Sequence, residues 1–293
     1  MTTPPWDRLH HAYGPATEVP AWLAALRDPD PEARRAARQS LSGSIYHQGT
    51  RWPASAYAVP ALVDLVDDPA TPDRAWALDL LRGVAIGDLR DDQLPFAPEV
   101  AFRDAAGVTA ADADMIARGL FDGDGLDDED GDLVELADAV VVWWAARAFD
   151  AAAGHVQAYR RWLADPDAEV AALAAELVVW FGGSPPTVAA LLAVPDGPAR
   201  PSVNLALAHL PDSGRGRHSP ADSALETLLA AEREATAVTA AVALAYRAGP
   251  ELPDAALTTL VEAAGRDSLP DVRGWDRALR GFVAVALRKV GLV

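Results

Sequence analysis

The side chains with the most recognisable binding chemistry lie in one short connecting segment. They are Tyr46, His47, Gln48 and Trp52, set around Gly49. Aromatic rings, an imidazole and an amide on a segment between helices can recognise a ligand or a peptide. The same residues also suit a structural turn, because His47 and Gln48 can bond backbone groups left free between helices. We favour the structural interpretation and keep the binding one open.

These four residues and His11 are the candidate interaction residues. A metal site would need His10, His11 and His47 to fold together, and no helix-spaced carboxylate or His-x-x-x-His pattern accompanies them. The chain has no cysteine, which excludes disulfides, iron–sulfur clusters and thiolate catalysis. Neither a phosphate-binding loop nor a nucleophile elbow occurs in the sequence. We therefore expect no catalytic residue, metal or cofactor.

Two charged segments could bind ions. Residues 122–132 alternate carboxylates as the start of an EF-hand calcium loop does. Counted from Asp128, however, the sixth and twelfth positions are Leu133 and Ala139 instead of Gly and Glu, so a solvated acidic loop is favoured. Residues 211–220 are basic and rich in glycine and serine. They could contact an anion, although arginines in such a loop are usually solvated.

Two aromatic pairs stand on apolar stretches, Trp143-Trp144 and Trp180-Phe181. Their rings could serve as stacking platforms in a groove. Large aromatic side chains on apolar helices more often belong to the core, so we favour a core role for both pairs.

An internal repeat predicts the elements that position these residues. Residues 20–41 and 60–81 match at an offset of 40 positions, a period typical of helical repeat proteins. The identical pairs are Pro20/Pro60, Ala21/Ala61, Asp28/Asp68, Pro29/Pro69, Arg34/Arg74, Ala37/Ala77 and Leu41/Leu81. The frame returns around Asp165-Pro166-Asp167. Each copy predicts two helices joined by a sharp turn, because the residue before a proline is pushed out of the α region.

Proline and capping residues mark where these helices begin. Pro20 and Pro60 suit the first helical position, where the missing amide hydrogen costs nothing. Asp30, Thr71 and Asp167 are placed to cap the second helices of the three copies. No strand is expected, because β-branched alternation is scarce.

Further helices follow from apolar periodicity and alanine-rich composition. They are predicted at residues 98–106, 110–120, 133–153, 188–194, 199–210, 221–231, 234–247, 254–264 and 275–290. Val140–Trp144 alone is ambiguous, and its long alanine-rich flanks predict a buried helix there.

The repeated motif resembles HEAT repeats, in which a proline sits in the first helix, an Asp in the turn and an Arg in the second helix. It lies at residues 28–37, 68–77 and 165–174. The third copy has Gln157 and Ala171 in place of the proline and the arginine. Residues 11–14 and 45–50 are similar to stretches of bacterial HEAT-repeat proteins of unassigned biochemistry. The resemblance implies an all-α fold, a right-handed α-solenoid of helical hairpins with a concave partner-binding surface. It implies no activity.

The repeat also predicts the organisation of the chain. Residues 1–86 carry the N-terminal repeats and residues 133–293 the C-terminal ones. Between them, residues 87–132 lose the period and form an irregular insertion with the acidic loop. We expect one continuous solenoid, since helices this apolar must cover one another's faces.

Composition narrows the class of partner. The 43 acidic residues outnumber the 25 basic ones and give a formal charge of −18. A field of this sign repels nucleic acid and favours basic partners. The N-terminus has no secretory signal, and no uncharged run approaches the roughly 18 apolar residues that span a bilayer. We expect a cytoplasmic protein that does not enter a membrane.

The sequence leaves three functions to compare. The first is a non-enzymatic scaffold that binds a protein or peptide partner on its concave face, where the acidic charge would favour a basic one. The alternative is a HEAT-like enzyme acting on nucleic acid, such as an alkylpurine DNA glycosylase. That enzyme would need a basic face formed by Arg34, Arg35, Arg38, Arg74 and Arg82. The third is a structural subunit that joins a larger assembly through an uncovered terminal helix, Trp275–Val290. The oligomeric state is open.

Overall fold

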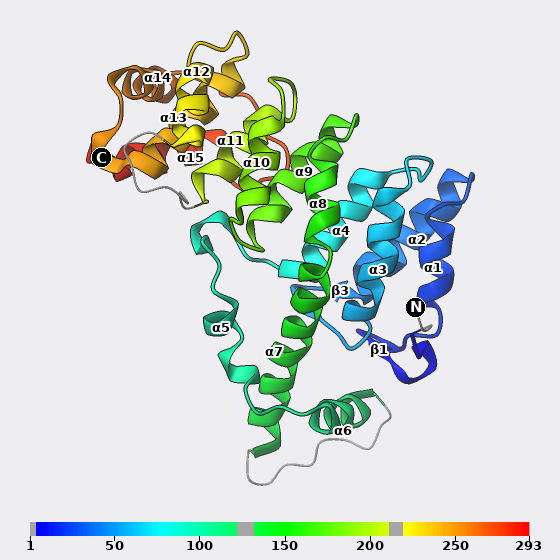
Figure 1. The fold of residues 1–293 in the computed structure, drawn as a ribbon. Coiled ribbons are helices and arrows are strands. Elements are labelled where there is room, and N and C mark those ends of the chain that lie inside the picture. Colours follow the sequence, from blue (N-terminus) through cyan, green and yellow to red (C-terminus); the bar gives the residue numbers. More distant parts are fainter. Residues whose placement is uncertain (1–3, 122–131, 211–218, 293) are drawn as a thin grey trace. The chain divides into compact units, whose positions relative to one another are not determined.

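The computed structural model describes residues 4–121, 132–210 and 219–292 (Figure 1). The described chain is mainly helical, as the sequence predicts. Its first elements are β1 (His10–His11), β2 (Gly14–Pro15), α1 (Val19–Ala25), α2 (Pro31–Ser44), β3 (Tyr46–His47), β4 (Thr50–Arg51), α3 (Ser55–Asp67) and α4 (Arg74–Ile86). Next come α5 (Pro98–Ala101), α6 (Ala110–Phe121), α7 (Asp132–Ala153), α8 (Val156–Trp162) and α9 (Ala168–Val179). The last are α10 (Pro185–Ala193), α11 (Arg200–Ala208), α12 (Pro220–Leu228), α13 (Glu234–Ala248), α14 (Asp254–Ala264) and α15 (Leu279–Lys289).

The chain forms two compact units. Unit 1 comprises Met1–Leu89 with Ala97–His155, and unit 2 comprises Arg90–Phe96 with Val156–Val293. The division predicted from the sequence, at residues 1–86, 87–132 and 133–293, is based on where the repeat period is lost and not on contacts within the structure. It therefore stays a prediction. No helix in the described ranges is both long and apolar enough to cross a membrane.

In unit 1, α1 to α4 form two helical hairpins that pack side by side (Figure 1, blue to cyan). The Asp30 carboxylate accepts a hydrogen bond from the Glu32 amide and caps α2, as predicted. Two other start signals are wrong. Pro60 lies inside α3, which begins earlier, at Ser55. The second hairpin's turn continues past Thr71, so α4 begins only at Arg74.

Each of these helical hairpins is preceded by a two-stranded β-hairpin that the sequence analysis did not expect. Strand β1 pairs with β2, and β3 pairs with β4, both antiparallel. The β1–β2 hairpin is tied to α2 by a backbone bond from the Ala12 amide to the Ser44 carbonyl, and to the start of α3 by one from the Ala54 amide to the His10 carbonyl. Strands of two residues are too short to show alternation, which is why composition did not reveal them.

The repeated arginine joins one hairpin to the next. The Arg34 guanidinium donates to the Asp28 carbonyl at 2.9 Å and to the Asp73 carboxylate of the following hairpin at 3.1 Å. Arg38 donates to the same carboxylate at 2.7 Å. In the second copy, Arg74 donates to the Val66 carbonyl at 2.8 Å. These bonds satisfy carbonyls that the turn leaves free and hold the second helix against the first.

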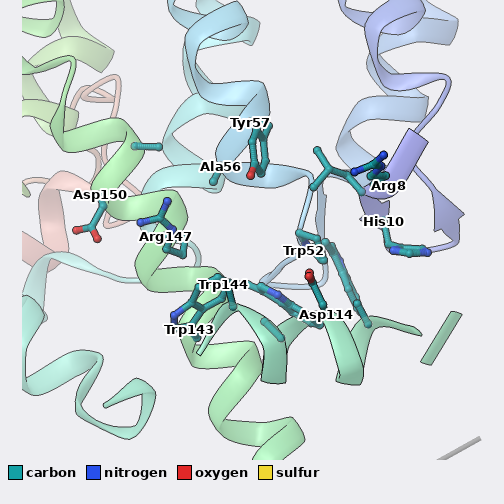
Figure 2. Close-up of a pocket in the computed structure, with 16 residues that line it drawn as sticks. Arg8, His10, Trp52, Ala56, Tyr57, Asp114, Trp143, Trp144, Arg147 and Asp150 are labelled. Carbon is teal, nitrogen blue, oxygen red and sulfur yellow. The ribbon is translucent and has the colours of Figure 1, made fainter. Parts of the chain in front are cut away.

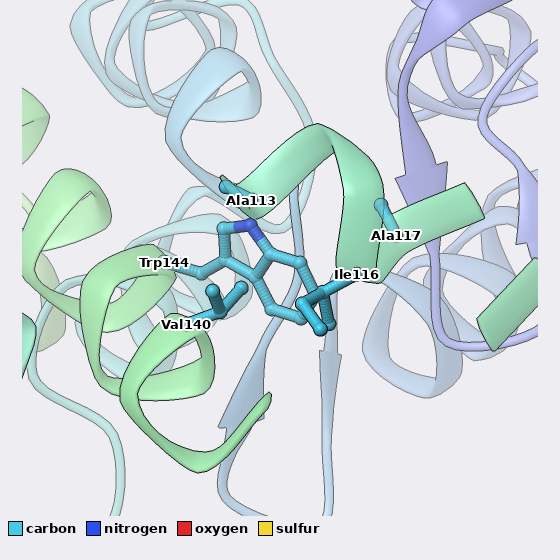
Figure 3. Close-up of a cluster of buried hydrophobic side chains, with 5 residues drawn as sticks. All are labelled: Ala113, Ile116, Ala117, Val140 and Trp144. Carbon is cyan, nitrogen blue, oxygen red and sulfur yellow. The ribbon is translucent and has the colours of Figure 1, made fainter. Parts of the chain in front are cut away.

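Helices α6 and α7 complete unit 1. The ambiguous Val140–Trp144 stretch is helical and lies within α7, which packs on both α3 and α4. Helix α6 lies across the N-terminal half of α7, where its apolar side chains form a small core with Val140 and Trp144 (Figure 3). The α6 members of that core are Ala113, Ile116 and Ala117. Their spacing of three and four residues places them on one helix face.

Unit 2 is a succession of helix pairs. Helices α9, α11, α13 and α15 each pack on the next in the row, and α10 contacts both α8 and α12. Asp167 caps α9 by accepting from the Glu169 amide, as predicted. The last helix starts at Leu279 instead of Trp275, and its apolar side chains are buried against α13 and α14.

Candidate functional site

The strongest sequence candidates lie on the β3–β4 hairpin. Its two turn residues, Gln48 and Gly49, have positive φ angles of 49° and 81°. Two consecutive left-handed residues match the twist of a tight hairpin, and glycine adopts this conformation without strain. Residues 46–51 therefore form a tight turn, and it orients Tyr46 and His47 on strand β3.

Tyr46 is held against the end of α4. Its hydroxyl donates to the Asp88 carboxylate, and a Cβ atom on Gly83 would lie 2.8 Å from its ring. Burial, followed by the bond to Asp88, raises the pKa of Tyr46 well above its usual value. Tyr46 and Gln48 line a depression of about 400 Å³ that also exposes Trp76. Because Tyr46 is locked and protonated, it has a positioning role in this hairpin.

His11 and His47 meet through Tyr13. The Tyr13 ring stands edge-on to His47 at 5.3 Å, and its backbone amide donates to Nδ1 of His11 at 3.1 Å. His11 is buried against Trp22, and burial lowers the pKa of His11. The third histidine considered in the sequence, His10, stacks on Phe121 with ring centroids 4.9 Å apart. The candidate histidines are thus packed among aromatic rings.

Trp52, the fifth candidate, lines a cavity of about 740 Å³ in unit 1 (Figure 2). We call it the tryptophan cavity. Its aromatic wall is formed by His10, Trp52, Tyr57, Trp143 and Trp144. Its volume falls in the range of about 300–1,000 Å³ typical of small-molecule and side-chain pockets.

Packing between elements creates this cavity. Trp52 follows β4, and its ring lies 6.1 Å from that of Trp144 on α7 and 5.7 Å from that of Phe121 on α6. Besides Asp114, the α6 residues that line the cavity are Ala110, Ala113 and Ala117. Small side chains at this spacing leave one side hollow, while the indole rings are fixed by their neighbours.

Four charged side chains surround the tryptophan cavity: Arg8, Asp114, Arg147 and Asp150. Figure 2 places Arg8 near one end, Arg147 and Asp150 near the other, and Asp114 between them. None of the four makes an ion pair with another residue in the described part of the chain. The Arg147 guanidinium lies over the Trp143 ring, 5.8 Å from its centroid. The cavity therefore combines ring faces with charges of both signs that pair with no side chain in the described ranges.

The remaining sequence candidates separate into three cases. Trp144 and Trp180 are buried, and the Trp180 indole donates to Glu176 at 2.7 Å, so both belong to the core as favoured. Trp143 is only half-buried and is accessible from the cavity. The acidic run up to residue 131 and the basic loop at 211–218 lie outside the described residues. Among the described residues, no three His, Asp or Glu side chains are placed to hold a metal ion.

Sequence reasoning identified Trp52 and Trp143 but missed the charged residues beside them. A usable signal existed on α7, where Trp143, Arg147 and Asp150 follow one another at spacings of four and three. Such spacing places the three side chains on one helix face. On α6, Asp114 stands between Ala113 and Ala117, which line the cavity. This pattern points to the cavity only once α6 is known to pack on α7.

No protein-family model matches this sequence, and a search of curated proteins returns no match. The class of protein must therefore be argued from the fold and the cavity themselves.

Proposed function

We propose that this chain is a non-enzymatic protein-interaction module that holds a segment of a partner protein in the tryptophan cavity. The observation that carries the proposal is the cavity itself, about 740 Å³ in volume and lined by aromatic rings. Aromatic side chains dominate the binding energy of protein interfaces, because their large rings exclude water and pack in pockets.

We also propose that the helix pairs form a right-handed α-solenoid of HEAT-like hairpins. Two observations support this. The pair Arg34–Asp73 joins consecutive hairpins in unit 1, and the row α9, α11, α13 and α15 in unit 2 has the nearest-neighbour packing that defines solenoids. A solenoid presents a long concave surface on which a partner segment can lie beyond the cavity.

The partner that we propose is basic. The formal charge of −18 attracts cations over the length of the screening distance, about 8–10 Å at physiological salt. Association with a basic partner is then fastest at low salt and slows as salt is added.

The two other functions receive less support. A nucleic-acid enzyme needs a free basic face, but Arg34 and Arg38 pair with Asp73, and Arg35 pairs with Glu32. The other two arginines of that set donate to backbone carbonyls of their own hairpin or of the segment after it. A structural subunit was expected to dock through its terminal helix, yet the apolar face of α15 is buried.

Two neighbouring substitutions on α6 test the proposal. Ala110 lines the cavity, whereas the adjacent Ala111 is exposed and does not. Ala110→Trp fills the cavity, and Ala111→Trp adds the same side chain outside it. Each tagged variant is used to capture proteins from the lysate of the native host at low and moderate salt, with mass spectrometry of the retained proteins.

The expected result is one basic protein retained at stoichiometric amounts by the wild type and by Ala111→Trp. It is lost from Ala110→Trp and weakened by salt. Equal retention by all three forms would place the interaction elsewhere on the molecule. Retention of nucleic acid in place of protein would favour the enzyme alternative.

A further inference from the structure

We propose that the tryptophan cavity binds the guanidinium group of a single arginine side chain of the partner, with Asp114 as its counter-ion. This inference rests on the proposed function and specifies the chemistry of the group that enters the cavity.

The aromatic wall suits a planar cation. Ring faces carry negative electrostatic potential, and a guanidinium group stacks on them more readily than an ammonium group does. The cavity already holds one such contact, because the Arg147 guanidinium lies over the Trp143 ring, 5.8 Å from its centroid. The rings of Trp52 and Tyr57 also line the cavity, and among the described residues no arginine or lysine lies over either ring.

A counter-ion is in place within the cavity. Asp114 projects from α6 beside the indole rings of Trp52 and Trp144 in Figure 2. It makes no ion pair or side-chain hydrogen bond with another described residue. A carboxylate can accept two parallel hydrogen bonds from one guanidinium group, which gives this pair geometric specificity as well as energy.

The cations at the ends of the cavity limit the sequence around the arginine. Arg8 and Arg147 lie at opposite ends of the cavity (Figure 2). They would repel lysines or arginines next to the bound residue and attract acidic ones. At the cavity, the geometry therefore favours one arginine with acidic or neutral residues directly beside it, whereas the charge of −18 attracts the basic partner as a whole.

Capped synthetic peptides test the proposal directly. The parent peptide is Glu-Ala-Arg-Ala-Glu, acetylated and amidated. Three variants replace its arginine by citrulline, replace it by lysine, or replace both glutamates by lysine. Binding to the full-length protein is followed by titration of the indole ¹H–¹⁵N signals, which Trp52→Phe and Trp143→Phe variants assign. Citrulline keeps the planar shape of arginine, but an oxygen replaces one terminal nitrogen, so the charge and two of the five N–H donors are lost.

We expect the parent peptide to bind at least fivefold more tightly than any of its three variants, with shifts at the Trp52 signal. Asp114→Asn should weaken binding of the parent peptide about tenfold, which is the usual scale for the loss of one charge-assisted hydrogen-bonded pair. Asp138→Asn is the matched control, because Asp138 is exposed on α7 and does not line the cavity. It should leave the affinity unchanged.

Three outcomes would overturn the inference: equal affinity for the citrulline peptide, equal loss in both Asn variants, or no binding of any peptide. The proposed function would survive each of them if Ala110→Trp still lost a partner protein that Ala111→Trp retained. Conversely, if the arginine peptide bound but no partner protein were captured, the cavity chemistry would be supported and the proposed interaction module alone would be contradicted.

Discussion

Two arginines on long helices show how differently the two units use the same side chain. In unit 2, Arg247 on α13 is nearly buried, with a side chain 7% exposed. Its guanidinium donates to the Asp222 carboxylate at 2.6 Å and to the carbonyls of Leu207 and Leu210 at 3.0 and 2.9 Å. In unit 1, Arg147 on α7 is exposed, and its guanidinium lies over the face of Trp143.

This difference separates a structural role from a binding role. A buried guanidinium must have its donors satisfied, and around Arg247 they hold α12, α13 and the end of α11 together. Burial alone would raise the pKa of Asp222, but the hydrogen bond and charge of Arg247 outweigh it and lower that pKa below its usual value. Within the part of the chain that the structure describes, the charges around the tryptophan cavity have no such partners, so they are available to an incoming group.

The largest effect is expected at Arg247. Arg247→Met should destabilise unit 2 by about 3–5 kcal/mol, because it leaves the Asp222 carboxylate and two carbonyls without their partner in a buried site. Hydrogen exchange followed by mass spectrometry measures this region by region. We expect loss of protection in peptides covering α11 to α13. A loss of less than about 1 kcal/mol would mean that the network is not structural.

A second large effect is expected at His209, also in unit 2. Its ring stacks on Trp275 at 5.5 Å, and its Nε2 atom is buried without a hydrogen-bond partner in the described chain. Burial, with help from Lys289 and Arg277, lowers the pKa of His209 from 6.5 to about 4.

The sign of the pH effect follows from this pKa. Between pH 6.5 and pH 4 the unfolded chain takes up a proton at His209 that the folded chain does not. The free energy of unfolding should therefore fall by roughly 3 kcal/mol as pH decreases through this window, since each pKa unit corresponds to about 1.4 kcal/mol. Urea unfolding of the wild type and of His209→Phe at several pH values measures it. Identical pH dependence in both proteins would contradict the prediction.

The helices of both units were predictable, because their signals are local. An Asp-Pro pair ends a helix, and the aspartate that follows the proline caps the next helix. Asp30 and Asp167 do so by accepting hydrogen bonds from the Glu32 and Glu169 amides. The prediction failed where the turn was longer. Thr71 was expected to cap the second helix, but Pro72 and Asp73 extend the turn, and α4 begins only at Arg74. The hairpin strands were missed, although Gln48-Gly49 is the kind of dipeptide that closes a tight turn.

The site was less predictable than the fold, and for a different reason. Trp52 and Trp143 are distant in sequence and line one cavity only because α6 and α7 pack beside the β3–β4 hairpin. Whether a charged side chain finds a partner is also a tertiary property. The sequence shows arginines at 147 and 247, and nothing local distinguishes the exposed one from the buried one.

The smallest effect is expected at Arg147, and it provides the sharpest test of the comparison. Arg147→Gln removes a charge that lies over Trp143 without an ion pair among the described residues. An exposed cation–π contact stabilises by about 0.5–1 kcal/mol, so thermal unfolding should change by no more than that. Binding of the lysine-flanked peptide should improve at the same time, because one of the two repelling end charges is gone. If Arg147→Gln instead destabilised unit 1 as Arg247→Met destabilises unit 2, the cavity charges would be structural, and the distinction between the two arginines would fail.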